Sequence, residues 1–228
     1  MENTTMTLDT IHTINIFEPG NTAAWDFLAS FTFPWDALPK INDFILELGA
    51  TLDESEYDHP SSDVWIHKTA TVAPTAFIGS AVIIGAETEV RHCAFIRNSA
   101  LVGSNAVVGN STELKNVILF NNVQVPHFNY VGDSILGYKA HMGAGSITSN
   151  VKSDSSLVSV TFGNERVETG MKKFGAILGD RVEIGCNSVL NPGSVIGSDT
   201  NIYPLSSIRG YVPAKSIYKR QNEIVEKY

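Results

Sequence analysis

A large apolar residue recurs at every sixth position from Ile66 to Phe120, and this spacing constrains the fold more than any other feature of the sequence. Most of these positions are followed four residues later by a small or β-branched residue, and several are followed directly by glycine, as at Gly79 and Gly103. A helix repeats every 3.6 residues and a strand every 2, so neither alone produces this spacing. It predicts a short strand and a tight turn, repeated, with small residues and glycine at the turns. The apolar positions are Ile66, Val72, Ile78, Ile84, Val90, Ile96, Val102, Val108, Leu114 and Phe120.

Three such units make one triangular coil of about 18 residues, which predicts a hexapeptide-repeat solenoid, a parallel β-helix. The spacing returns at Leu136 and again from Leu178 to Ile208. A β-sandwich with accidental spacing is the alternative, and an unbroken run of ten matching positions disfavours it. The solenoid resembles the left-handed parallel β-helix family, and the left hand rests on that resemblance, because periodicity does not fix it. The predicted fold class is therefore all-β.

The two ends of the chain lack the repeat and are expected to cover the solenoid. In residues 1–60 we predict an edge strand over "TINIFEP" and a helix from an N-cap at Asp36 to Gly49, together forming a cap for the open end. Residues 61–212 are predicted to form the β-helix. Residues 213–228 are predicted to form a closing C-terminal helix.

Two segments depart from the repeat, residues 121–135 and residues 149–177. The second contains "LVSVTFGNERVETG", two alternating runs around Gly163 and Asn164, which predicts a β-hairpin within an insertion loop. Because loops on a rigid scaffold often carry function, both segments are candidate parts of a site.

The bulk composition excludes several classes of function. The formal net charge of −8 argues against nucleic acid or an anionic membrane as the main partner. The two cysteines, Cys93 and Cys186, lie far apart and suggest neither a disulfide framework nor a metal motif. No apolar run is long enough to span a membrane, and residues 1–10 lack the order of a signal peptide. We therefore expect a cytoplasmic protein.

Arg97 and Lys115 each follow an inward aliphatic residue and lie one coil apart. Stacked cations at a strand spacing of about 4.8 Å repel each other unless an anion lies close by. Two interpretations remain open: a phosphate clamp, or two solvated side chains paired with Glu113 or Glu89.

His127 lies in the first irregular segment near Tyr130 and Asp133, and a histidine can accept a proton at neutral pH. Lys172 and Lys173 end the second segment and could reach the same place. Zinc between three histidines is the competing chemistry, but no three of the six histidines have a suitable spacing, so we expect no metal.

At this point the residues support a resemblance to a known family. The stretch "HFNYVGDSILGYKAHMGAGSITSN" resembles the β-helix acetyltransferase domain of bifunctional enzymes that N-acetylate glucosamine 1-phosphate and then uridylylate it. "KKFGAILGDRVEIG" and "FPWDAL" are similar to the archaeal type, the bifunctional sugar-1-phosphate nucleotidylyltransferase/acetyltransferases. The similarity covers roughly residues 30–215. We expect no nucleotidylyltransferase activity, because residues 1–60 are too few for that domain and contain no glycine-rich phosphate loop.

The resemblance implies a role for each of several residues. His127 matches the catalytic base, and Ala144 matches a residue whose backbone N–H lies near the acetyl group. It also implies a homotrimer with sites between subunits, acetyl-CoA as co-substrate, and a place in UDP-N-acetylglucosamine biosynthesis. The residues that match acceptor-binding positions are Arg97, Lys115, Tyr130, His141, Asn150 and Lys173; those that match coenzyme-binding positions are Ala144, Cys186, Pro204 and Lys219.

Some matched positions depart from the family pattern. His141 replaces the usual asparagine, which could alter the acceptor or the pH optimum, and the coenzyme positions hold Cys186, Pro204 and Lys219. The main functional prediction is an N-acetyltransferase that moves acetyl from acetyl-CoA to the amine of a hexosamine 1-phosphate. The alternatives are a non-catalytic β-helix that binds a sugar nucleotide or a partner enzyme, and an acyltransferase for another amino sugar or nucleotide-linked sugar.

Overall fold

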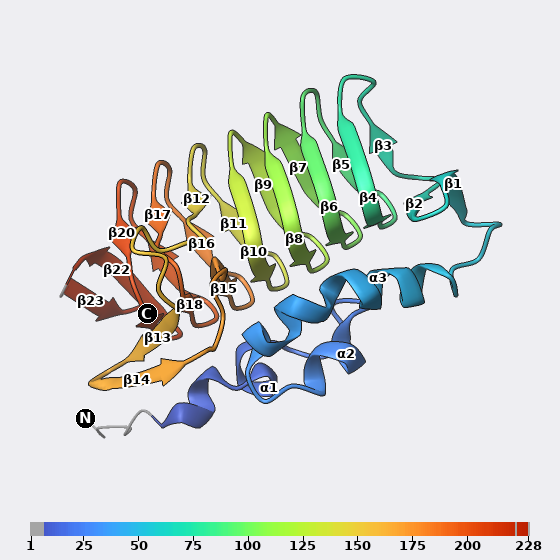
Figure 1. The fold of residues 1–228 in the computed structure, drawn as a ribbon. Coiled ribbons are helices and arrows are strands. Elements are labelled where there is room, and N and C mark those ends of the chain that lie inside the picture. The colour runs from blue at the N-terminus through green and yellow to red at the C-terminus, as the bar shows by residue number, and fades with distance from the viewer. Residues whose placement is uncertain (1–6, 222, 228) are drawn as a thin grey trace.

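The structure, a computed structural model, describes residues 7–221 and 223–227, and it is the left-handed parallel β-helix that was predicted (Figure 1). Short helical segments come first, and stacked coils of short strands follow. The expectation about a signal peptide concerns residues 1–10, of which 1–6 lie outside the described residues. The helical segments are η1 (Leu8–Ile11), α1 (Thr13–Ile16), α2 (Trp25–Ala29), η2 (Pro34–Lys40) and α3 (Ile41–Gly49).

Each coil contributes strands to three stacks, which we call faces A, B and C in chain order. Face A contains β3 (Thr71–Val72), β5 (Glu89–Val90), β7 (Val107–Asn110), β9 (Gln124–His127), β11 (His141–Met142), β16 (Glu183–Ile184), β19 (Asn201–Ile202) and β22 (Ser216–Arg220). Four long strands bend so that their first halves lie on face B and their second halves on face C: β4 (Phe77–Ile84), β6 (Phe95–Val102), β8 (Glu113–Leu119) and β10 (Tyr130–Leu136).

Shorter strands complete faces B and C. Face B continues with β12 (Ile147–Thr148), β17 (Val189–Leu190) and β20 (Ser207–Ile208). Face C begins with β1 (Tyr57–Ser61) antiparallel to β2 (Val64–His67) and continues beyond β10 with β15 (Ala176–Leu178), β18 (Ser194–Ile196) and β21 (Tyr211–Val212).

The interior is a stack of apolar side chains that the six-residue spacing predicted. Val90, Val108 and Val125 pair through β5, β7 and β9, and each is at most 1% exposed. Residues with positive φ mark the corners between faces, and most of them are not glycine. At the corner between faces A and B these residues are Cys93, Ser111, Phe128, Gly145, Asn187 and Leu205.

The N-terminal segment covers face C and does not cap the open end of the solenoid. In Figure 1, α3 runs along the stack and crosses its strands, and it contacts β4, β6 and β8. The side chains that point outward from face C are apolar and lie buried beneath it, as Ile83, Leu101 and Ile118 do. The predicted edge strand over "TINIFEP" was wrong, because Thr13–Ile16 is the helix α1. The predicted helix up to Gly49 is present as η2 followed by α3, but the predicted N-cap at Asp36 was wrong, because Asp36 lies inside η2.

The segment 121–135 departs from the repeat as predicted, but it stays within the coil as β9 and β10 and does not form the expected loop. The positive-φ residues pass from Ser111 to Asn116 and from Phe128 to Asp133, and each of these steps is one residue shorter than the usual six. Two single-residue shortenings of face B therefore cause the slip in the repeat.

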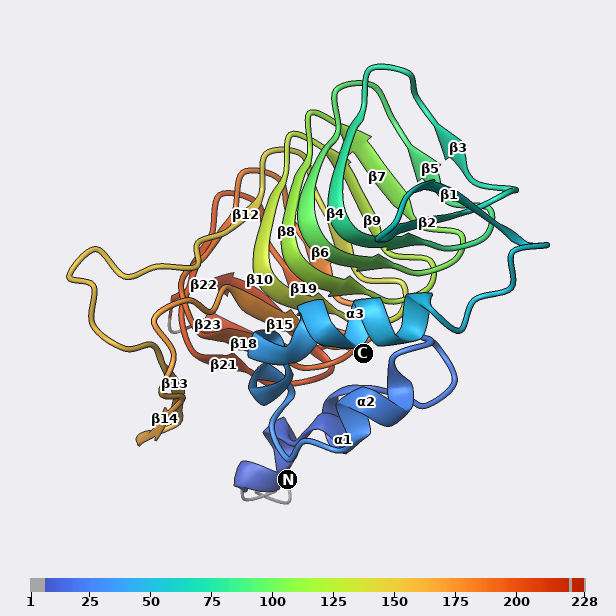
Figure 2. The same ribbon diagram turned by 45° about the vertical axis from the view of Figure 1, so that its right-hand side comes forward.

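The second departure is a true insertion at the corner between faces B and C. It leaves face B after β12 and returns to face C at β15. It contains the predicted hairpin, β13 (Ser159–Phe162) paired antiparallel with β14 (Glu165–Glu168). Figure 2 shows that the hairpin projects from the later coils. Phe162 packs on Tyr211 of face C with ring centroids 5.1 Å apart.

The predicted C-terminal helix was wrong. Residues Ser216–Arg220 form β22, the last parallel strand of face A, and β23 (Glu223–Glu226) folds back antiparallel to it. Tyr218 extends the inward column after Ile202, so the coil repeat continues where a helix was expected. In the described part of the chain, no helix has the length and apolar character needed to cross a membrane.

Candidate active site

One corner of the solenoid stacks four of the residues that the sequence singled out. His127, Ala144, Cys186 and Pro204 each immediately precede the positive-φ residue at the corner between faces A and B. Backbone hydrogen bonds link their coils: Gly145 N donates to His127 O at 3.0 Å, Asn187 N to Ala144 O at 2.9 Å, and Leu205 N to Cys186 O at 2.9 Å. The predicted base and three of the four predicted coenzyme residues thus form one column, which we call the A–B corner column.

His127 is the last residue of β9 and is exposed. Its backbone is held by Asn129, a side chain only 2% exposed. Asn129 Oδ1 accepts from His127 N at 3.1 Å, and its Nδ2 donates to Gly143 O at 2.9 Å on the next coil. Asn129 therefore fixes the turn that presents the imidazole, and sequence reasoning missed it because a buried turn asparagine leaves no mark on the repeat.

Beside Ala144 the backbone is open to a ligand. Among residues 7–221 and 223–227, no group accepts a hydrogen bond from Ala144 N, whereas the neighbouring Gly145 N is used between coils. Ala144 is half-buried. The N–H is thus available to a carbonyl oxygen bound along the A–B corner column.

Face B and its corner with face C hold Arg97 and Lys115, and each is paired with a carboxylate. Arg97 Nη1 lies 2.9 Å from Glu113 Oε1. Of the two interpretations given for the cations, this contact matches the one in which Arg97 pairs with Glu113. Lys115 Nζ donates to both oxygens of Asp133, at 2.8 and 3.0 Å, and the Asp133 side chain is only 5% exposed. We call this group, with the residues that bind it, the B–C polar cluster.

The cations do not align as the 18-residue spacing suggested. A register shift between Ile96 and Asn98 places Lys115 opposite Asn98, one residue beyond Arg97. The shift arises from the shortened face B strand of β8, whose next corner residue is Asn116. Arg97 and Lys115 still share one edge of face B, but each has its own carboxylate.

Tyr130 and Asn150 complete the B–C polar cluster. Asn150 Nδ2 donates to Tyr130 Oη at 3.2 Å and also to Asp133 Oδ2. Burial is the main cause that raises the pKa of Tyr130, and the nearby Asp133 and Glu113 carboxylates raise it further. The phenol therefore stays protonated at neutral pH, and its oxygen accepts the hydrogen bond from Asn150. Asn116 Nδ2 donates to Asp133 Oδ1 at 3.0 Å and to Leu38 O of η2 at 3.1 Å. These two bonds connect the cluster to the N-terminal segment.

Three predicted residues lie outside these two groups. His141 points outward from face A, where its Nδ1 lies 2.7 Å from Glu183 Oε2, a partner that sequence reasoning did not identify. Lys219 lies in β22 with its Nζ 3.6 Å from Glu223 Oε1. Lys173 is exposed at the end of the insertion, next to Phe174, whose N donates to Asn150 O at 3.0 Å.

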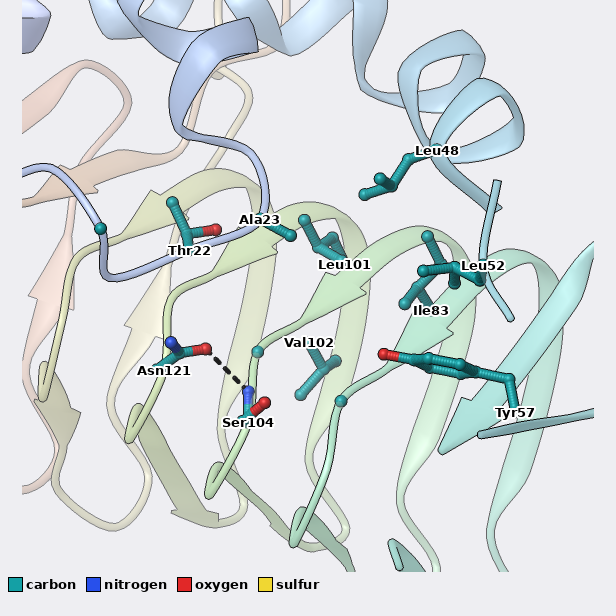
Figure 3. A pocket seen from close by; sticks show the side chains of 13 residues that line it. Thr22, Ala23, Leu48, Leu52, Tyr57, Ile83, Leu101, Val102, Ser104 and Asn121 are labelled. Atoms are coloured by element: carbon teal, nitrogen blue, oxygen red, sulfur yellow. Dashed lines mark hydrogen bonds between the residues drawn. The ribbon is translucent and has the colours of Figure 1, made fainter. Parts of the chain in front are cut away.

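A cavity of about 330 Å³ lies between the N-terminal segment and face C; Figure 3 shows the side chains that line it. The Tyr57 hydroxyl points into it, and burial raises the pKa of Tyr57. Asn121 Oδ1 accepts from Ser104 N at 2.9 Å at its edge. Its lining includes none of the predicted site residues, so it is separate from the candidate site. Within the described ranges, no three His, Cys, Asp or Glu residues are grouped so that they could hold a metal ion.

Two curated proteins similar to this chain agree with the sequence resemblance, and a solved structure is also similar to it. The bifunctional protein GlmU of Methanococcus aeolicus is 36% identical over 114 residues, which are 50% of this chain and 28% of that protein. A bifunctional sugar-1-phosphate nucleotidylyltransferase/acetyltransferase of Sulfurisphaera tokodaii is 34% identical over 91 residues, 40% of this chain and 23% of that protein. A solved hexapeptide transferase family protein from Anaplasma phagocytophilum is 17% identical, with a TM-score of 0.41 over 72% of this chain and 79% of that chain.

No protein-family model matches the sequence. The chain spans less than a third of the length of the two curated relatives described above. It resembles the archaeal bifunctional GlmU proteins over about half of its own length.

Proposed function

We propose that the chain is an acyltransferase that moves acetyl from acetyl-CoA to the amine of a hexosamine 1-phosphate. The observation that carries the proposal is the A–B corner column, because it sets an exposed imidazole in line with an open backbone N–H. His127 lies at one edge of face B, and the B–C polar cluster lies at the other. A ligand that spans face B therefore meets a base at one end and cations at the other.

Acetyl-CoA would lie along the A–B corner column below His127. Ala144, Cys186 and Pro204 follow one another on successive coils, and Lys219 lies in the next strand of face A. The backbone N–H of Ala144 would donate to the thioester oxygen as negative charge develops there. The Lys219 ammonium suits a phosphate of the coenzyme.

The acceptor would lie on face B. Arg97 has N–H groups beyond the one that binds Glu113, and with Lys173 it would hold the phosphate. Lys115 is neutralised by Asp133, so its part is to position Tyr130 and Asn150 through that carboxylate and less to bind the phosphate directly. The Tyr130 phenol would donate to a sugar oxygen.

The chemistry needs one base. His127 takes a proton from the acceptor ammonium, and the neutral amine attacks the thioester carbon. A C–N bond forms, the C–S bond breaks, and CoA leaves as a thiolate. The second amine proton ends on that thiolate, while His127 returns the first to solvent. Holding the amine beside the thioester supplies much of the remaining acceleration.

Replacing His127 tests the proposal directly. His127→Ala should lower kcat about 10²–10⁴-fold while acetyl-CoA affinity is kept, because general base catalysis contributes about that factor. His92→Ala is the matched control, since His92 precedes the corner residue Cys93 of an earlier coil and should leave kcat unchanged. Thiol release with glucosamine 1-phosphate and galactosamine 1-phosphate measures turnover, and calorimetry measures acetyl-CoA binding. Equal kcat in wild type and His127→Ala contradicts the base, and acetyl-CoA binding without thiol release would favour a non-catalytic binding role.

A further inference from the structure

Two phenylalanines stand exposed side by side on face B. Phe77 is 57% exposed and Phe95 is 41% exposed, and their ring centroids lie 5.4 Å apart. The apolar side chains that point outward from face C are instead buried by the N-terminal segment and the hairpin. Large exposed apolar groups placed together on a soluble protein commonly mark a binding surface.

These rings are in line with the proposed acceptor site. Phe77 pairs in register with Phe95, Phe95 with Glu113, and Glu113 with Tyr130, so the four outward side chains follow one another on face B. At about 4.8 Å for each strand spacing, the three spacings put the backbones of Phe77 and Tyr130 about 14 Å apart. An extended nucleoside diphosphate with a sugar attached can cover such a span.

Arg97 lies in the same strand as Phe95, and its side chain contacts both Phe95 and Glu113, the residue between Phe95 and Tyr130 on face B. Its guanidinium carbon is 6.0 Å from the centre of the Phe95 ring, and its Nη1 binds Glu113. A guanidinium has five N–H donors, so donors remain for a phosphate. Its side chain is 45% exposed, which leaves it accessible to a ligand on face B.

We propose that the hexosamine 1-phosphate of the proposed function is accepted as part of a nucleotide-linked amino sugar, and that face B binds the nucleotide part. The base stacks on Phe77 and Phe95, the diphosphate meets Arg97, and the sugar reaches Tyr130 with its amine towards His127. Stacking on aromatic rings tolerates any base, so these rings recognise a nucleotide without fixing which one. The assignment of the sugar end rests on the proposed function, whereas the assignment of the nucleotide end does not.

Binding of the nucleotide alone tests the first half. Calorimetry of the full chain with UDP, GDP and dTDP should detect binding of at least one of them. Phe95→Ala and Phe77→Ala should each weaken it about tenfold or more, within the range measured for base stacking. Leu46→Ala, which removes a side chain 38% exposed on α3, is the control and should change nothing. No binding by the wild type, or equal binding by all variants, overturns the proposal.

Kinetics test the second half and separate it from the proposed function. The kcat/KM for a nucleoside-diphosphate-linked hexosamine should exceed that for the hexosamine 1-phosphate, and Phe95→Ala should remove most of the difference through KM. Equal losses for both acceptors, together with a lower molecular mass in light scattering, would mean that the rings pack against a second copy, and would overturn the proposal. Nucleotide binding without acetyl transfer defeats the proposed function and leaves the nucleotide site standing. Acetyl transfer to the hexosamine 1-phosphate without nucleotide affinity does the reverse.

Discussion

Gly109 lies where any side chain would strike the next coil. A Cβ added there would overlap the carbonyl group of Pro126, which is backbone and cannot move aside without displacing the strand. Gly109→Ala should therefore destabilise the solenoid by about 3 kcal/mol or more, as overpacking at a rigid contact does. Urea unfolding monitored by circular dichroism measures the change.

Gly163 provides the matched control for this prediction. It occupies the hairpin turn with φ +58°, and an added Cβ would meet nothing within 4 Å. Gly163→Ala should cost about 1 kcal/mol, the ordinary penalty for a left-handed alanine. If the two substitutions destabilise equally, the contact between coils is not what requires glycine at position 109.

Glycines such as Gly109 also show one limit of prediction from the sequence. The repeat suggested that glycines after the inward residues allow tight turns, but Gly85 and Gly103 instead allow close contact with the adjacent coil. The turns themselves use left-handed residues such as Glu87 and Asn105. A six-residue spacing reveals where the core is, and it does not distinguish a glycine needed for conformation from one needed for space.

Asp133 and Glu113 offer two ion pairs of different burial within one cluster. The Asp133 and Lys115 side chains are 5% and 19% exposed, whereas those of Glu113 and Arg97 are 31% and 45% exposed. Asp133→Asn should cost about 3 kcal/mol or more in unfolding free energy, because it leaves the Lys115 ammonium partly buried without a counter-charge. Glu113→Gln should cost much less, since solvent screens its pair. Matched urea transitions decide, and similar losses would mean that solvent also screens Lys115.

The outward face of each strand decides what covers it. On face C an apolar residue precedes the inward one in coil after coil, as in Leu101–Val102 and Ile118–Leu119, whereas face A carries polar residues such as Gln124 before Val125. This contrast is visible in the sequence and predicts a cover for one face. The sequence does not show which segment supplies the cover. The cover depends on contacts between residues far apart in the chain, such as Trp35 with Phe174 at the end of the insertion. The expected end cap was therefore a lateral cover.

The N-terminal segment is fastened to the corner between faces C and A by Arg181. Arg181 Nη2 lies 2.8 Å from Glu18 Oε1, and its Nε lies 2.7 Å from Asp199 Oδ1. The hydrogen bonds and the charge of the guanidinium lower the pKa of both carboxyls. A lowered folded pKa adds stability above the ordinary pKa values and loses it as the pH falls through the folded values. Burial raises the pKa of the neighbouring Asp180, which acts in the opposite direction.

Arg181→Gln should therefore flatten the acid limb of the stability profile. Between about pH 6 and about pH 3 the wild type should lose more unfolding free energy than the variant, because the variant's Glu18 and Asp199 titrate nearer their ordinary pKa values. Burial dominates the Asp180 shift and persists in the variant. Arg166→Gln is the control, since its ion pair with Glu168 lies in the exposed hairpin. Urea titrations across this range measure both slopes, and parallel profiles for wild type and Arg181→Gln would contradict the assignment.

At the scale of the whole molecule, the predicted site residues are divided between two faces. His141 points outward from face A with Glu183, whereas Tyr130 and the cations belong to face B and its far corner. Outward side chains on two faces of a triangular solenoid diverge. The resemblance implied that these residues share a site, but a single chain does not bring them together. We therefore propose that His141 joins the site of a neighbouring subunit in a homotrimer.

Mixing two inactive variants tests this arrangement. His127→Ala keeps His141, and His141→Ala keeps His127, so each alone should be nearly inactive if one site uses both from different subunits. After co-refolding at equal concentrations, about a quarter of the sites should contain both intact residues, because each site draws its two halves independently from the mixture. Light scattering should give about three times the 24.7 kDa chain mass. Restored thiol release in the mixture supports a shared site. The control mixes the variant that carries both substitutions with either single variant, and it should show no thiol release. A mixture as inactive as its components would mean that His127 and His141 serve the same chain, or that His141 takes no part in transfer.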